Sequence, residues 1–235
     1  MKHDLADGLV WYLVFLFSTC FHEAAHAWTA HRLGDDTAYR GGQVTLDPTP
    51  HIRREPFGMV LVPLLSYFFG GWMIGWASAP YDPQWAWRYP KRSGLMALAG
   101  PVANLILVLV AAILMRLAFE WGVMRQPDYG SMTELVVATG DANGLWALAA
   151  KVLSLFFSLN LLLAAFNLLP FPPLDGGSVP LIFLPAGAAE KYWVLLRQPV
   201  WSFMGLIVAW RLFGEVFPPL FGMASKVLYL ALTGH

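Results

Sequence analysis

The stretch His22-Glu23-Ala24-Ala25-His26 decides both the fold and the chemistry, and it lies within an apolar run from Leu9 to Leu33. Residues four apart share one face of a helix, so both imidazoles can reach the same metal ion. Two histidines and a third protein ligand leave one coordination position open for water, as in catalytic zinc sites. Glu23 lies beside His22 and remains free to take a proton from that water.

An ordinary helix is the alternative interpretation, because a pattern of five residues is short. Here the flanking residues are apolar over most of the thickness of a bilayer. Ionisable side chains in such a setting are energetically costly unless they have partners and a function. The sequence therefore predicts a metal site on this helix, and one further residue must complete it.

The composition indicates an integral membrane protein. Of 235 residues, 57% are hydrophobic and 13% are charged, and the mean hydropathy is +0.55. Average proteins contain about 25% charged residues. The formal net charge is zero, which argues against a nucleic-acid partner. Cys20 is the single cysteine, so neither an internal disulfide nor a cysteine-rich zinc site can form.

Several apolar segments are long enough to cross a bilayer as helices, and they cover residues 9–33, 93–119, 144–169 and 200–221. Residues 57–79 are also apolar, but Pro63 and Gly70-Gly71 interrupt them, so this segment either spans or enters and returns. The first segment is too long for a cleavable signal peptide.

The expected fold is therefore an all-α polytopic membrane protein with three transmembrane helices around a zinc site. A re-entrant or partly embedded segment, a short β strand or hairpin and a C-terminal transmembrane helix complete it. We expect one domain over residues 1–235, with its core at 9–177 and a C-terminal loop and helix at 178–235.

The predicted strand is Gln43-Val44-Thr45-Leu46, whose alternation has β character. Gly41-Gly42 precedes it and Pro48 follows it. An exposed strand edge here could pair with an extended peptide and present a bond for cleavage. A simple connecting loop is the alternative, and the sequence does not favour either.

Candidates for the third ligand lie near the ends of apolar segments, and they are His31, Asp47, His51, Asp82 and Asp175. The first faces away from the motif, because it is five residues beyond His26, and the next three lie in polar loops. Asp175 differs, because it follows a proline-rich helix end and precedes two glycines that allow the backbone to bend. A carboxylate that caps backbone groups is the alternative role for Asp175.

Three motifs together resemble the site-2 proteases, a family of intramembrane zinc metalloproteases. They are His22-Glu23-Ala24-Ala25-His26, Gly100-Pro101-x-x-Asn104 and Asn167-x-x-Pro170-x-x-x-x-Asp175-Gly176. Residues 41–51 and 75–80 are similar to the short branch of that family, which has no PDZ domain.

The resemblance implies one Zn²⁺ per chain, bound by His22, His26 and Asp175, with Glu23 as the general base. It also implies that Asn104 and Asn167 line the site and hold the substrate backbone or the developing oxyanion. Hydrogen bonding between helices is the alternative role for both asparagines.

A shared zinc ion also constrains the topology. Asp175 and the two histidines lie towards the downstream ends of their helices, so these helices must run parallel. A single crossing by residues 57–79 would make them antiparallel, and we therefore expect that segment to be re-entrant near Gly70-Gly71. The arrangement gathers basic residues on one side, which the positive-inside rule assigns to the cytoplasm. The expected location is a bacterial inner membrane, with the site open to the cytoplasm.

The leading function is regulated cleavage of transmembrane segments in membrane-protein substrates, with the lipid bilayer as the environment. A membrane protein that handles or transports zinc with the same ligands is an alternative, although few ionisable residues lie along the predicted spans at 93–119 and 144–169. An inactive scaffold would need none of the four motif residues. A regulatory membrane protein is a further possible partner, and the sequence does not identify one.

Overall fold

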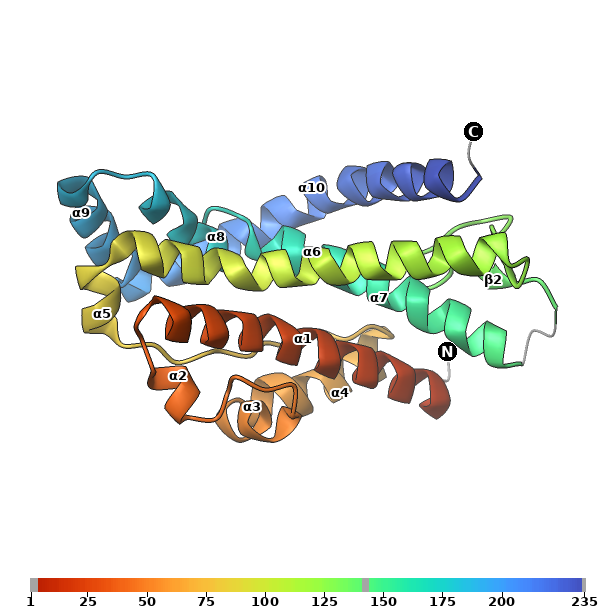
Figure 1. Cartoon of the computed structure of the whole chain (residues 1–235), viewed down its shortest axis with the longest axis horizontal. Coiled ribbons are helices and arrows are strands. Elements are labelled where there is room, and N and C mark those ends of the chain that lie inside the picture. The colour runs from red at the N-terminus through yellow and green to blue at the C-terminus, as the bar shows by residue number, and fades with distance from the viewer. Residues whose placement is uncertain (1–3, 141–143, 234–235) are drawn as a thin grey trace.

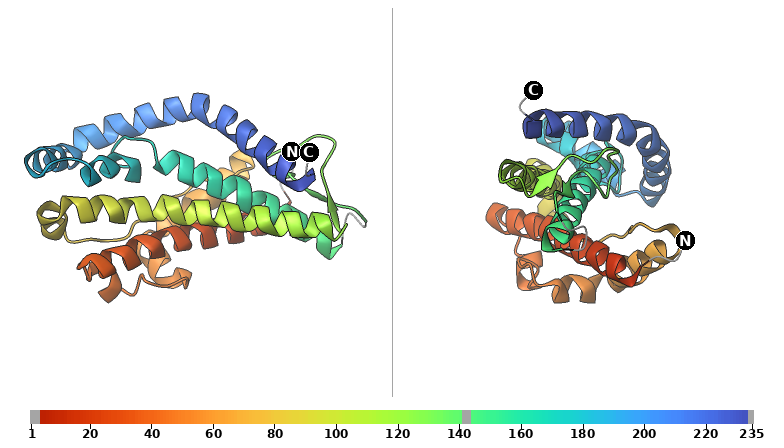
Figure 2. Two further views of the ribbon diagram at one scale, coloured as in Figure 1. Left: turned by 45° about the horizontal axis from the view of Figure 1, so that its top comes forward. Right: turned by 90° about the vertical axis from the view of Figure 1, so that its right-hand side faces the viewer.

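Four long helices dominate the structure, a computed structural model that describes residues 4–140 and 144–233 (Figure 1). Each is long and apolar enough to cross a membrane, and they are α1 (Leu5–Leu33), α6 (Pro90–Glu120), α7 (Leu145–Asn167) and α10 (Pro199–Thr233). Helix α6 packs against both α1 and α7, and α10 covers the opposite face of the α6–α7 pair (Figure 2). The predicted all-α polytopic membrane architecture is confirmed.

Helix α1 carries the histidine motif, and capping residues set its two ends. The Asp4 side chain accepts a hydrogen bond from the backbone N–H of Ala6, so the helix begins at Leu5 instead of the predicted Leu9. Gly34 ends it in the left-handed conformation with φ 102°, which a residue without Cβ adopts at little cost. The predicted end at Leu33 is confirmed.

Helices α1 and α7 run parallel, as the shared site requires (Figure 1). Near their starts, Lys151 of α7 forms an ion pair with Asp7 of α1. Beyond the end of α7, Asp175 lies 3.1 Å from His22 in the second half of α1. Contacts at both ends therefore fix the direction, and α6 runs antiparallel to the pair.

The broken apolar segment reverses its direction at the predicted glycine pair, and its re-entry into the bilayer stays a prediction. It consists of the π-helical turn η1 (Phe57–Leu61) and α4 (Val62–Gly70), and Gly71 then reverses the chain in the left-handed conformation with φ 76°. The returning chain lies along the entering one, because the Trp76 N–H donates to the Gly58 carbonyl at 3.1 Å.

The predicted strand at Gln43–Leu46 is wrong, because Gln43 belongs to no regular element and residues 44–46 form bends between α2 (Thr37–Arg40) and α3 (Pro48–Arg54). Local hydrogen bonds take the groups that a strand would pair: the Gln43 N–H donates to the Ala38 carbonyl. The Asp47 side chain caps α3 directly afterwards. The helix cap is thus a stronger local determinant than the alternation of four residues that predicted a strand.

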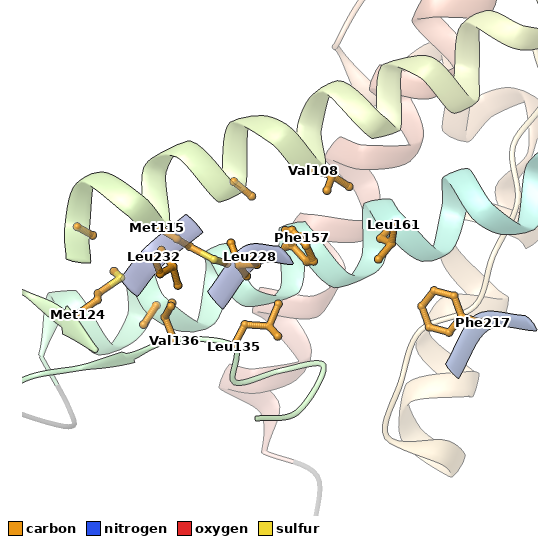
Figure 3. Packing of buried hydrophobic residues seen from close by; sticks show 13 residues of the cluster. Val108, Met115, Met124, Leu135, Val136, Phe157, Leu161, Phe217, Leu228 and Leu232 are labelled. Carbon is orange, nitrogen blue, oxygen red and sulfur yellow. The ribbon is translucent and has the colours of Figure 1, made fainter. Parts of the chain in front are cut away.

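In the part of the chain that the structure describes, strands occur only as β1 (Met124–Arg125) and β2 (Val137–Ala138), an antiparallel pair after α6. The loop that contains them packs on a cluster formed with α6, α7 and α10 (Figure 3). The Ser154 hydroxyl of α7 holds this loop by accepting from the backbone N–H groups of Leu135 and Val136.

The remaining short helices lie at the other end of the bundle, and they are α5 (Pro83–Arg88), α8 (Asp175–Ser178), η2 (Val179–Ile182) and α9 (Ala186–Leu196). Helix α10 continues past the predicted end at residue 221, through Pro218 and Pro219. Arg116 of α6 donates to the Leu232 carbonyl at 2.8 Å, which satisfies a carbonyl in the last turn of α10.

Single-cysteine labelling tests this topology. In a Cys20→Ala background, Arg53→Cys and Gln84→Cys should react with a membrane-impermeant maleimide from the same side of sealed vesicles. Asp128→Cys should react only from the other side. The three positions are exposed, and residues 53 and 84 flank the re-entrant segment, whereas α6 separates 84 from 128. Labelling of 53 and 84 from opposite sides would contradict the re-entrant path.

Candidate metal centre

His22, His26 and Asp175 converge although the last two lie 149 positions apart in the sequence. Their ligand atoms all lie within 4.8 Å of one another. The two Nε2 atoms are 2.9 Å apart, and Oδ2 of Asp175 lies 3.1 Å from that of His22 and 3.3 Å from that of His26. The structure thus brings together all three ligands predicted from the sequence.

Asp175 reaches the histidines because the chain turns sharply after α7. Pro170, Pro172 and Pro173 prevent the helix from continuing beyond Asn167. Gly176 then packs against the end of α7, where a Cβ would lie 2.3 Å from the Leu168 carbonyl oxygen. The glycine after Asp175 is therefore a packing requirement as well as a bend.

Helix α6 orients both imidazole rings. The Oδ1 atom of Asn104 lies 2.5 Å from Nδ1 of His22, and the Met96 carbonyl lies 2.7 Å from Nδ1 of His26. Since both partners accept, each Nδ1 carries the proton, and each Nε2 presents its lone pair to the cluster. Both rings are thus in the tautomer that binds a metal through Nε2.

Gly100 leaves the space that a metal would need. A Cβ at this position would lie 2.3 Å from Nε2 of His26 and 2.4 Å from Nε2 of His22. The donors that surround this space are two imidazole nitrogens and one carboxylate oxygen, a set that suits zinc. The residues present therefore fit a Zn²⁺ ion with an open coordination position.

Glu23 is 5% exposed and directly follows His22 on α1. Among the described residues, no hydrogen bond or ion pair engages its carboxylate. A buried carboxylate beside the ligands is placed to accept a proton from water and pass it on.

The two asparagines predicted to line the site have different surroundings. Asn104 is fully buried, with its oxygen on His22 and its amide nitrogen 2.8 Å from Oδ1 of Asn160 on α7. It thus lies behind the histidine and bonds between helices, which was the alternative role. Asn167 is half-buried at the last residue of α7, and its contact with substrate stays a prediction.

Asn160, which is fully buried near the middle of α7, was not predicted from the sequence as part of the site. The sequence did contain a signal for it, namely a single amide side chain in the apolar run Ser158-Leu159-Asn160-Leu161. Such an amide is energetically costly in a membrane unless it has hydrogen-bond partners. Its partners lie on two other helices, and the linear sequence cannot identify them.

The other ligand candidates have local roles. His31 pairs with Asp36 at 2.7 Å, and Nε2 of His51 lies 3.1 Å from the Thr45 carbonyl. Asp82 caps α5. Asp47 caps α3, and its hydrogen bonds from Thr49 lower the pKa of this carboxyl.

Comparison with known proteins agrees with this geometry. A profile of peptidase family M50 matches residues 10–207. The chain belongs to peptidase family M50. Both the site-2 protease resemblance and the predicted enzyme class, a zinc metalloprotease of the membrane, are thereby confirmed. No solved structure matches the chain.

Curated relatives of this M50 peptidase carry corresponding names. The chain is 32% identical to "Putative zinc metalloprotease YwhC" of Bacillus subtilis, over 91% of this chain and 95% of the relative. It is 32% identical to "Putative zinc metalloprotease Rip2" of Mycolicibacterium smegmatis and 34% identical to Rip2 of Mycobacterium tuberculosis. Each Rip2 match covers 69% of this chain but only 52% of the relative, so the chain spans about half of their length.

Removal of Asp175 tests the ligand set. Asp175→Ala should lower zinc affinity by more than the ~10–100-fold typical of lost outer-shell contacts, because a direct ligand disappears. Zinc per chain, measured by mass spectrometry on detergent-purified protein, gives the readout. Asp128→Ala is the control, since its carboxylate is exposed in the loop after α6. Equal zinc in both variants would place the third ligand elsewhere.

Addition of one methyl group tests the space at Gly100. Gly100→Ala should displace both imidazoles and abolish stoichiometric zinc binding, because its Cβ would overlap their Nε2 atoms. Gly222→Ala is the matched control within α10, where no atom of residues 4–140 or 144–233 lies within 4 Å of the added Cβ, apart from the adjoining helix backbone. Normal zinc content in Gly100→Ala would contradict the assigned site.

Proposed function

We propose that this M50 peptidase hydrolyses peptide bonds within or next to transmembrane segments of membrane-protein substrates. The observation that carries the proposal is the depth of the site: His22, Glu23 and His26 are buried within a helix long enough to span the bilayer. Cleavage of soluble peptides does not require a site within the membrane span. A substrate segment that lies in the bilayer can reach such a site from the side. Cleavage of this kind would serve regulated intramembrane proteolysis.

The chain's own residues divide the chemical work. His22, His26 and Asp175 would hold Zn²⁺, which when bound supplies Lewis acidity for hydrolysis. Glu23 would accept the proton of the attacking water and deliver it to the leaving amine. Asn104 and Met96 would keep the imidazole tautomers fixed throughout.

We also propose that the site opens to the cytoplasm across a bacterial inner membrane. Basic residues concentrate between the last turn of α1 and the first turn of α6, and between α7 and α10, and they are Arg32, Arg40, Arg53, Arg54, Arg88, Lys91, Arg92, Lys191 and Arg197. The positive-inside rule assigns such segments to the cytoplasm. Bacterial relatives support the choice of membrane.

The substrate must unwind before cleavage, because helical amides are hydrogen-bonded internally and shielded by side chains. A transmembrane segment with helix-breaking residues should therefore be cut faster than an unbroken one. Residues 43–46 offer no strand for pairing, so the ease of unwinding has to come largely from the substrate.

Glu23→Gln tests the proposed base. In proteoliposomes with a single-span protein that carries Gly-Pro in its membrane segment, cleavage should fall by about 10²–10⁴-fold, the usual contribution of a general base. Zinc content should persist, because Glu23 is not a proposed ligand. Glu190→Gln, an exposed carboxylate on α9, is the control.

Mass spectrometry of the products locates the cut. A site within or beside the membrane segment in wild type, absent in Glu23→Gln, is the expected result. Zinc translocation into the liposomes without any cleavage would instead favour the transport alternative, since transport needs no base.

A further inference from the structure

We propose that Asn160 of α7 is a positioning residue that fixes the orientation of His22 through Asn104. The proposal rests on the metal site, and it is independent of which substrate the enzyme cleaves. It assigns a role in zinc binding to a residue whose hydrogen bonds, within the described part of the chain, join it to Ser18, Asn104 and Phe156 and not to a metal ligand or Glu23.

A continuous series of hydrogen bonds leads from α7 to the metal site. Asn160 donates through Nδ2 to the Phe156 carbonyl at 2.8 Å and to the Ser18 hydroxyl at 2.9 Å. Its Oδ1 atom accepts from Nδ2 of Asn104 at 2.8 Å. Oδ1 of Asn104 then lies 2.5 Å from Nδ1 of His22. The series joins α1, α6 and α7.

The Phe156 carbonyl gives this series its direction. A carbonyl can only accept, so the amide atom of Asn160 that faces it must be Nδ2. Oδ1 of Asn160 therefore faces Asn104 and requires Nδ2 there, which leaves Oδ1 of Asn104 for His22. An acceptor at Nδ1 forces the proton onto that nitrogen, so Nε2 is free for the metal.

Burial prevents the donor and acceptor roles in this series of hydrogen bonds from being reversed. Ser18, Asn104 and Asn160 are each 0% exposed, so water cannot replace a lost partner. A flip of either amide would bring two acceptors or two donors face to face, and a buried unpaired polar group is costly. A fixed backbone carbonyl of one helix thus sets the tautomer of a metal ligand on another.

Simple attachment of α7 to the other helices is the competing role for Asn160. It predicts that loss of Asn160 lowers stability without a specific effect on zinc. The positioning role predicts a loss of zinc affinity that depends on Asn104. A double-mutant cycle separates the two, because residues that act in one series give non-additive effects.

The experiment measures zinc affinity of the detergent-purified full chain by competition with a chelator. Asn160→Leu should weaken zinc binding by about 10–100-fold, the usual effect of an outer-shell loss. Visible spectra of the Co²⁺-loaded protein should change, because the orientation of His22 changes. Ser158→Ala is the matched control: Ser158 is buried on the same helix, and its hydroxyl has no hydrogen-bond partner among the residues that the structure describes.

The cycle combines Asn104→Ala with Asn160→Leu. We expect the double variant to bind zinc no more weakly than Asn104→Ala alone. If Asn160→Leu does not fold, Asn160→Ser carries the test, because serine can still bond the Phe156 carbonyl but is too short to reach Asn104.

Unchanged zinc affinity in a folded Asn160 variant would overturn the proposal, as would fully additive effects in the cycle. Wild-type protein without zinc affinity would overturn the metal site itself. That failure is distinguishable from a failure of Asn160, because it precedes any substitution.

Discussion

The close approach of α6 to α1 at Gly100 is the constraint on which the rest of the site depends. Met96, Gly100 and Asn104 are spaced by four residues, so they form one stripe on α6. The glycine lets the backbone of α6 lie against both imidazoles, and its two neighbours on the stripe then meet Nδ1 of each ring. The contact between α6 and α1 at Gly100 thus determines both the space available for a metal and the tautomers of its two histidine ligands.

The bilayer explains why the polar side chains within the spans form hydrogen bonds with one another. Lipid offers no hydrogen bonds, so polar atoms within the spans must pair with one another. Ser18, Asn104 and Asn160 lie in the seam between α1, α6 and α7, whereas the outward faces of α6 carry residues such as Leu109 and Ile113. The same hydrogen bonds therefore join the three helices and contact the Nδ1 atom of a metal ligand.

The sequence predicted those features that depend on one residue type or one strong pattern. The parallel direction of α1 and α7 follows from a single metal cluster, and the reversal at Gly71 follows from two adjacent glycines. The prediction of a strand at Gln43–Leu46 was wrong because four alternating residues are a weaker signal than Asp47, the helix-capping residue that follows them. Asn160 was missed because its role depends on which helices meet it, and periodicity within α7 does not contain that information.

The loop that carries Asp175 lies on the more exposed side of the site. The side chain of Asp175 is 21% exposed, against 8% and 7% for those of His22 and His26, so the opening lies on its side. A cavity of about 280 Å³ adjoins this loop at Pro172, Pro173 and Leu174.

Helix α9 holds the same loop from outside the spans. The Tyr192 hydroxyl donates to the Gly177 carbonyl at 2.8 Å. A tyrosine hydroxyl is protonated at neutral pH and can donate, and burial raises the pKa of Tyr192 further. Because Gly177 is two residues beyond Asp175, the contact ties the third ligand to α9. The position of the third ligand therefore depends on α9 as well as on the packing of Gly176 against the end of α7.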